Sequence, residues 1–239
     1  MQRFLELAVP TTDILASLAF YETLGFTQAS VGETWEHSYA VISDGRLLIG
    51  LHAGVFNDIT PVFVHSGLKD WHRSLTAQGI DCEQAELDDD SFNQVRLRDP
   101  DGGPVLLVEA RTYSPPAGDP VRSRLGFFGE YVLPTHDLAA ARRFWEMLGL
   151  MEGWQGDTPQ PWARFTGSDV TLGLYESATV LPGLAFYAPD MAERVDGLAR
   201  EGCEMRPPGR RSGLPHCLGI LTAPEGTLLY LCDEAGWPE

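Results

Sequence analysis

The sequence repeats itself at an offset of 124 residues. The segment from Glu6 to Asp13 (ELAVPTTD) returns from Glu130 to Asp137 (EYVLPTHD), and residues 18–26 (LAFYETLGF) are matched by residues 142–150 (RRFWEMLGL). A duplicated chain is expected to fold as two similar units. We therefore predict tandem domains at residues 1–112 and 124–239. The linker at residues 113–123 is rich in proline and glycine, which interrupt regular structure.

Each half carries a shorter pattern of one strand, one helix and three strands. Thr12 or Asp13 can cap a helix that follows the first strand, and Gly25 can close it. In the first half, the apolar periodicity predicts strands at 4–9, 38–42, 47–51, 62–64, near 80, at 94–97 and at 104–108, with a second helix at 68–78. The predicted fold class is α+β, with four βαβββ modules, two in each half.

Three of these features together resemble a known family. A first strand leads to Asp13, the pattern LAFYETLGF follows at 18–26, and a DPDG turn at 99–102 precedes a final apolar strand. In this order, and duplicated, they resemble the vicinal oxygen chelate superfamily, which includes glyoxalase I, fosfomycin and bleomycin resistance proteins and extradiol dioxygenases. The resemblance covers both halves. It implies paired βαβββ modules whose curved, mixed sheets enclose a cup, in which most members hold a divalent metal ion.

The residues at the expected ligand positions argue against a metal. The resemblance places ligands at the start of first strands and on last strands. Those positions hold Phe4, Thr60, Phe128 and Gly183, and Gly50, Leu106, Gly173 and Tyr230, respectively. None is a conventional ligand for a divalent ion, so we predict no cofactor. The alternative is a divalent metal at a relocated site, with Glu6, Glu130 and His52 as ligands one step along each strand.

The two carboxylates are the candidate catalytic residues. Strand alternation places Glu6 on the same face as Phe4, and Glu130 on the same face as Phe128. An apolar wall disfavours a charged carboxylate and raises its pKa, which suits an acid or base near neutrality. Hydrogen bonding in a wet cavity is the alternative role for both.

Aromatic, histidine and arginine side chains complete the candidate site. Aromatic rings offer stacking surfaces to a planar guest, and imidazoles accept protons near neutral pH. The predicted ligand-binding residues are Phe4, Trp35, His37 and His52 in the first half, and Phe128, Trp162, Arg164, His216 and Tyr230 in the second. The basic loop carrying Arg206, Arg210 and Arg211 is a candidate lid over an anionic group. These features make the second cup the preferred site, although core packing and solvated roles are the alternatives.

Composition limits the classes of partner. The chain has 17 Lys and Arg against 34 Asp and Glu, a formal net charge of −17, which disfavours nucleic acid and anionic membrane surfaces. It contains no apolar run of about 18 residues, and its four cysteines show no CxxC pair. We therefore expect a cytoplasmic protein with reduced, mostly buried thiols, present as a monomer or homodimer.

Three functions are compatible with these observations. The leading hypothesis is a metal-independent protein that binds a small organic molecule, aromatic or carboxylate-bearing, in a cup lined by aromatics and a Glu. The alternative is an enzyme of the glyoxalase, lyase, isomerase or extradiol dioxygenase type, with relocated metal ligands or a Glu base. The third is a protein interaction module whose cups are filled. Fold alone does not decide among them.

Overall fold

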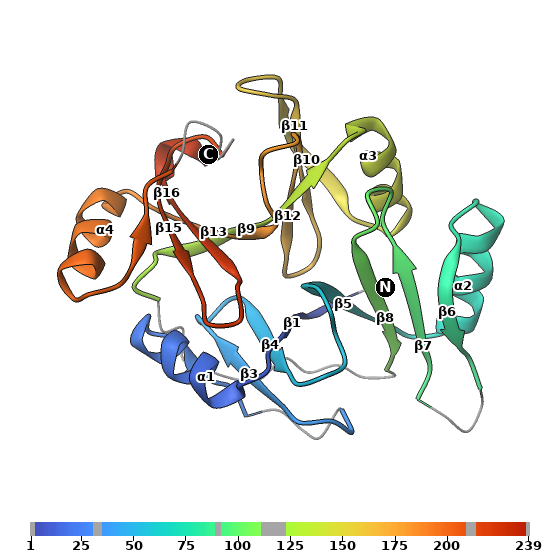
Figure 1. The fold of residues 1–239 in the computed structure, drawn as a ribbon. Coiled ribbons are helices and arrows are strands. Elements are labelled where there is room, and N and C mark those ends of the chain that lie inside the picture. The colour runs from blue at the N-terminus through green and yellow to red at the C-terminus, as the bar shows by residue number, and fades with distance from the viewer. Residues whose placement is uncertain (1–2, 31–34, 89–91, 111–122, 209–213, 238–239) are drawn as a thin grey trace.

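The computed structural model describes residues 3–30, 35–88, 92–110, 123–208 and 214–237 of the 239-residue chain. These residues form two eight-stranded mixed sheets and four α-helices (Figure 1). The predicted linker lies outside them except for Ser123. None of the helices in these ranges is both long and apolar enough to cross a bilayer.

The first half follows the predicted module order twice. Its elements are β1 (Arg3–Pro10), α1 (Ile14–Thr23), β2 (Thr27–Gln28), β3 (Tyr39–Ser43), β4 (Leu48–His52), β5 (Thr60–His65), α2 (Leu68–Ala77), β6 (Cys82–Glu86), β7 (Gln94–Arg98) and β8 (Pro104–Glu109). The strand expected near Ile80 begins at Cys82 instead, because Ile80 packs into the core just after α2 ends.

The second half repeats this order and adds a short helix at its end. Its elements are β9 (Phe127–Thr135), α3 (Leu138–Met147), β10 (Met151–Gly156), β11 (Trp162–Thr166), β12 (Thr171–Glu176), β13 (Gly183–Ala188), α4 (Met191–Arg200), β14 (Met205–Arg206), β15 (Cys217–Thr222), β16 (Leu228–Asp233) and the 3₁₀ helix η1 (Glu234–Gly236). The α+β fold of four βαβββ modules is thus confirmed.

The first helix of each half, α1 and α3, is capped in the same way. The Asp13 side chain accepts a hydrogen bond from the Ala16 N–H at 3.0 Å, and the Asp137 side chain accepts one from Ala140 N–H at 2.9 Å. Each bond satisfies a backbone donor that the first helical turn leaves unpaired. Gly25 has a φ of 88° just past α1, a left-handed conformation that glycine adopts without strain.

The first strands lie at the centre of each sheet. The order is β2-β3-β4-β1-β5-β8-β7-β6 in the first sheet and β10-β11-β12-β9-β13-β16-β15-β14 in the second. β1 runs parallel to β4 and antiparallel to β5, and β9 pairs in the same way with β12 and β13. Two modules are therefore joined through their first strands in each sheet.

Each sheet has an apolar face toward the helices and a second face that lines a cup. In the first half, Leu7 and Val9 pack with α1 in the main core, while Ala8, Val62 and Leu106 form a separate cluster on the other face. In the second half, the cup face carries a cluster that includes Val132, Tyr175, Ala185, Tyr187 and Tyr230. The alternation of side chains along each strand produces this division.

A bulge in each first strand overturns one predicted orientation. The register shifts between Phe4 and Glu6 in β1, and between Phe128 and Glu130 in β9. One extra residue per strand moves the earlier side chain to the opposite face. Phe4 and Phe128 consequently pack in the main core on the helix side, where Phe4 meets Phe63 at 5.8 Å between ring centroids. They do not line the cups as the alternation predicts.

Bonds between equivalent segments join the two halves. The turn before β16 reaches α1, where Glu225 accepts hydrogen bonds from Ser17 Oγ at 2.8 Å and Tyr21 OH at 2.9 Å. The matching turn before β8 reaches the start of α3, where Asp101 contacts His136 at 2.8 Å. Figure 1 shows α1 on the same side as α4, and α2 on the same side as α3. The first module of each half thus packs against the second module of the other.

Candidate functional site

The first cup holds a row of three hydrogen-bonded side chains. Glu6 Oε1 and His52 Nε2 are 3.0 Å apart, and His52 Nδ1 lies 2.8 Å from His37 Nε2. Glu6 is 3% exposed and His52 is fully buried, whereas His37 is half-buried. The row therefore leads from a buried carboxylate to an imidazole that reaches solvent.

The strand arrangement explains how these side chains meet. Glu6 lies on β1 and His52 at the end of the neighbouring parallel strand β4, while His37 precedes β3. A Cβ atom added to Gly50 would lie 2.5 Å from Glu6 Oε2. Glycine at this position therefore leaves the space in which the carboxylate lies.

Hydrogen-bond donors and acceptors along the row determine the tautomers. With Glu6 as a carboxylate, Oε1 only accepts, so His52 Nε2 carries the proton. Nδ1 of a neutral His52 then accepts from His37 Nε2–H, which leaves the Nδ1 of a neutral His37 as an acceptor. A proton taken up at this nitrogen can be passed along the row to Glu6.

Aromatic rings surround the row. Trp35 Nε1 donates to Glu6 Oε1 at 3.2 Å. Tyr39 stacks on His52 at 5.6 Å between ring centroids, and Phe56 meets the same imidazole edge-on at 4.9 Å. Trp35, His37 and His52 were predicted from the sequence, whereas Tyr39 and Phe56 were missed because single aromatics are more often core.

Burial holds His37 in its neutral form. Desolvation lowers the pKa of His37 from its ordinary value, and the neighbouring His52 lowers it further. The Glu6 carboxylate opposes this effect more weakly. His37 is therefore an acceptor at neutral pH rather than a cation.

The second cup is closed by a buried ion pair. Glu130 Oε2 accepts from Arg164 Nε at 2.6 Å, and Oε1 accepts from an Arg164 terminal nitrogen at 3.2 Å. The hydroxyls of Tyr175 and Tyr187 donate to Oε1 at 2.6 and 2.7 Å. Burial and the Glu130 charge raise the pKa of both tyrosines well above the ordinary value. All four hydrogen bonds therefore join groups of the protein to one another inside the second cup.

Arg164 is itself enclosed by aromatic rings. Its guanidinium lies 5.0 Å from the Trp162 ring centroid and 4.5 Å from that of Trp237, which follows η1. Burial opposes its charge, but the Glu130 carboxylate outweighs this and raises the pKa of Arg164. Trp162 and Arg164 were both predicted as ligand-binding residues, and here the Arg164 guanidinium lies over Trp162 and pairs with Glu130.

Three register positions account for the difference between the cups. The duplicate positions of His52, Val41 and Val64 are Tyr175, Arg164 and Tyr187, as the equivalent strand pairings show. The second cup thus has a tyrosine where the first has His52, and an arginine and a second tyrosine where the first has valines. Aligning the later strands at an offset of 123, one less than the first-strand offset, would have identified Tyr175 as the counterpart of His52 and Tyr187 as the counterpart of Val64.

The described residues do not fit a divalent metal ion. Such an ion needs at least three converging nitrogen, oxygen or sulfur donors. Glu6 and His52 bond to each other, while Glu130 lies in the other sheet and is bonded to Arg164. Within the described ranges, His, Cys, Asp and Glu side chains form no group of three or more that could hold a metal. The relocated triad of Glu6, Glu130 and His52 is therefore not assembled.

Among the described residues, none of the remaining candidates forms a hydrogen bond with Glu130. Tyr230 lines the second cup, but its hydroxyl donates to the Leu181 carbonyl at 2.9 Å, and burial raises its pKa to about 12. His216 is exposed in a turn, with a φ of 59°. Arg206 bonds to Thr222 Oγ1 at 2.8 Å. Arg210 and Arg211 lie outside the described residues.

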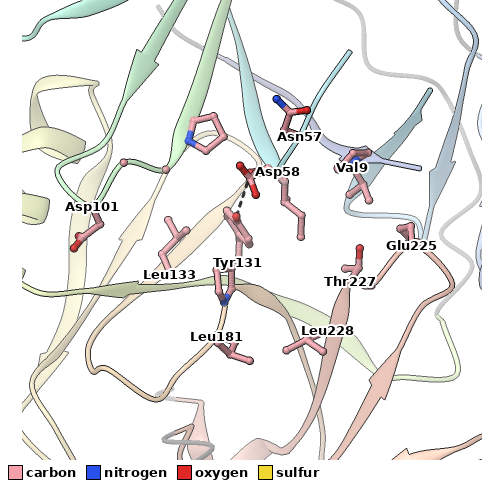
Figure 2. Close-up of a pocket in the computed structure, with 17 residues that line it drawn as sticks. Val9, Asn57, Asp58, Asp101, Tyr131, Leu133, Leu181, Glu225, Thr227 and Leu228 are labelled. Carbon is pink, nitrogen blue, oxygen red and sulfur yellow. Dashed lines mark hydrogen bonds between the residues drawn. The ribbon is translucent and has the colours of Figure 1, made fainter. Parts of the chain in front are cut away.

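A cavity of about 580 Å³ lies at the seam between the halves. Figure 2 shows Tyr131 in its middle, with Val9 and Asp58 from one half and Leu181 and Leu228 from the other. Tyr131 OH donates to the Ile59 carbonyl at 3.3 Å. The Asp101 and Glu225 carboxylates on its wall are engaged in the bonds that join the halves. Two of its carboxylates therefore serve the seam, and the row of Glu6, His52 and His37 makes the first cup the better candidate site.

Solved structures share this fold across nearly the whole chain. A catechol 2,3-dioxygenase is 17% identical, with a TM-score of 0.61, covering 96% of this chain and 87% of that one. The Mn(II)-bound glyoxalase from Novosphingobium aromaticivorans is 15% identical, with a TM-score of 0.62 and coverage of 98% and 83%. The 2,2',3-trihydroxybiphenyl 1,2-dioxygenase from Sphingomonas wittichii strain RW1 is 15% identical, with a TM-score of 0.61 and coverage of 97% and 90%.

The sequence comparisons add no closer relative. No protein-family model and no curated protein matches the sequence. At these identities the structural likeness concerns the fold. The chain has the fold of the vicinal oxygen chelate superfamily.

Proposed function

We propose that the protein binds a small, planar organic molecule in the first cup without the help of a metal ion. The observation that carries this proposal is the row from His37 through His52 to Glu6, which ends in an acceptor nitrogen near solvent. A ligand hydroxyl or amide can donate to this nitrogen. In the part of the second cup that the structure describes, the duplicate carboxylate is not available in this way, since both Glu130 oxygens accept bonds from Arg164.

The walls of the first cup favour an aromatic ligand. Trp35, Phe56 and His37 have ring centroids within 6.4 Å of one another, which gives flat surfaces for stacking. Arg96 lies over Phe56 at 5.7 Å and is placed to pair with a carboxylate substituent. Catechol 2,3-dioxygenase, a protein of the same fold, is named for a small aromatic compound, which supports this ligand class.

Ligand titration of matched variants tests the assignment. Aromatic compounds bearing hydroxyl or carboxyl groups would be titrated by calorimetry and tryptophan fluorescence. We expect Trp35→Phe and His37→Gln to weaken binding at least tenfold. Their controls in the second half, Trp162→Phe and His216→Gln, should leave it unchanged. Loss of binding in the controls alone would contradict the proposal. Native mass spectrometry of the same samples reports metal content and distinguishes monomer from homodimer.

The row also supports a second candidate, an enzyme that uses Glu6 as the final base. A substrate proton accepted at His37 Nδ1 would release the Nε2 proton to His52 Nδ1, and His52 Nε2–H would pass to Glu6. Glu6→Gln separates the two candidates, because an amide oxygen at Oε1 can still accept from His52 and Trp35 but takes up no proton. A binding protein keeps its affinity in this variant, whereas an isomerase or lyase keeps binding and loses exchange of substrate protons with deuterium oxide.

A further inference from the structure

Two of the four cysteines face each other across neighbouring strands of the second sheet. Cys217 begins β15 and Cys232 lies near the end of β16, and the two are directly paired in the antiparallel ladder. Directly opposed residues point to the same face of a sheet. Both side chains accordingly belong to the apolar cluster of the second cup.

The spacing of such a pair matches that of a disulfide. Opposed residues in antiparallel strands have Cα atoms about 4.5–5.5 Å apart, and disulfides span about 4.4–6.8 Å. The backbone beside the pair is held by a hydrogen bond from Asp233 N–H to the His216 carbonyl at 2.9 Å. The separation expected of directly opposed residues thus falls within the range that a disulfide spans.

The two thiols differ in a way that suits a stepwise reaction. A hydrogen bond with Cys232 lowers the pKa of the Cys217 thiol, whereas burial raises the pKa of Cys232 well above its ordinary value. Cys217 is 8% exposed and follows the exposed His216, while Cys232 is fully buried. Cys217 is thus the better nucleophile and the more reachable sulfur.

We propose that Cys217 and Cys232 form a reversible intrachain disulfide by exchange with a small organic disulfide such as glutathione disulfide. The Cys217 thiolate attacks one sulfur of the small disulfide, which forms a mixed disulfide and releases one thiolate. The Cys232 sulfur, losing its proton to solvent, then attacks the Cys217 sulfur and displaces the second thiolate. The protein loses two electrons, and the small disulfide is reduced to two thiols.

The other two cysteines provide a matched control. Cys82 and Cys203 are both half-buried and are more exposed than the facing pair. Cys82 lies in the first sheet and Cys203 follows α4 in the second half, so they are not opposed to any cysteine. If exposure alone governed oxidation, these two would react first.

The test is oxidation of the folded, full-length protein with mixtures of glutathione disulfide and glutathione. After thiol blocking and digestion, mass spectrometry should show a peptide linked through Cys217 and Cys232 within one chain. The Cys82→Ser/Cys203→Ser double variant should form this link at the wild-type rate. Cys232→Ser should stop at a glutathione adduct on Cys217, whereas Cys217→Ser should form no adduct on Cys232.

Other results would overturn the proposal. Glutathione adducts on Cys82 and Cys203, with Cys217 and Cys232 still reduced, would show that solvent exposure determines which cysteines are oxidised. A disulfide between two chains would show that oxidation links separate protein molecules instead of closing a bond within one chain. Oxidised wild-type protein should also melt at a higher temperature than reduced protein, and this difference should vanish in Cys217→Ala. A persistent difference in that variant would equally contradict the assignment.

Discussion

The duplicated carboxylates should differ sharply in their effect on stability. Glu130→Gln removes the charge that balances Arg164, whose side chain is 3% exposed beside a fully buried Glu130. If the glutamine carbonyl takes the place of Oε1, it still accepts the three hydrogen bonds that end there. Its NH₂ group then takes the place of Oε2, which lies 2.6 Å from Arg164 Nε in the wild type, and so brings two donors face to face. Removing one partner of a buried ion pair costs about 3–5 kcal/mol.

The same substitution at Glu6 should be mild. Within the described part of the chain, both hydrogen bonds to this carboxylate, from His52 and Trp35, end on Oε1. A glutamine carbonyl at that position retains both, so the loss is the difference between charged and neutral acceptors, about 1 kcal/mol. For a chain of this length, the melting temperature should fall by about 6–20 °C for Glu130→Gln and by about 2–4 °C for Glu6→Gln.

Differential scanning calorimetry of the two variants measures this contrast. Arg164→Met and the Glu130→Gln/Arg164→Met double variant complete a cycle. The double variant should lose less stability than the sum of the single ones, since no uncompensated charge remains buried. Equal melting temperatures for Glu6→Gln and Glu130→Gln would refute the assignment of a structural role to Glu130 and of a place at the buried end of the candidate-site row to Glu6.

Three further results are expected. Burial raises the pKa of Asp99 to about 6, so the stability contributed by the protonated side chain is complete below pH 3.8 and is lost as the pH rises through 6. Asp99→Asn should therefore be more stable than wild type at pH 7.5, by up to about 3 kcal/mol in urea unfolding. Near pH 3.5 the two proteins should be equally stable. Because the pKa of His37 is lowered, ligand affinity should be constant at and above pH 6.5 and should fall as the pH drops through the pKa of His37 in the folded protein. Tighter binding in acid would contradict the role of His37 as an acceptor. Gly50→Ala should displace the Glu6 carboxylate and lower the free energy of unfolding by about 1–3 kcal/mol in the same assay. Gly197→Ala in α4 places its Cβ with no atom within 4 Å and should raise the free energy of unfolding by about 0.5–1 kcal/mol.

The carboxylate site was only partly predictable. Glu6, His37, His52 and Trp35 were identified one by one from residue type and strand alternation, and the structure brings them into one hydrogen-bonded group. The preference for the second cup rested on Arg164, Trp162 and Tyr230 as free ligand-binding groups. In the structure these side chains interact with groups of the protein itself: Arg164 pairs with Glu130, Trp162 lies under the Arg164 guanidinium, and Tyr230 donates to the Leu181 carbonyl.

The sequence by itself determined the repeat, the module order and the helix ends. These depend on local signals: strand alternation, the aspartate caps at 13 and 137, and glycine beyond the first helix. Only the tertiary structure decided which faces the first-strand side chains occupy and which cup is filled. A single bulged residue moves Phe4 to the helix side, and Arg164 reaches Glu130 only because β11 and β9 both flank β12. Such contacts join residues distant in sequence, so strand pairing and register determine them, and no local pattern encodes either.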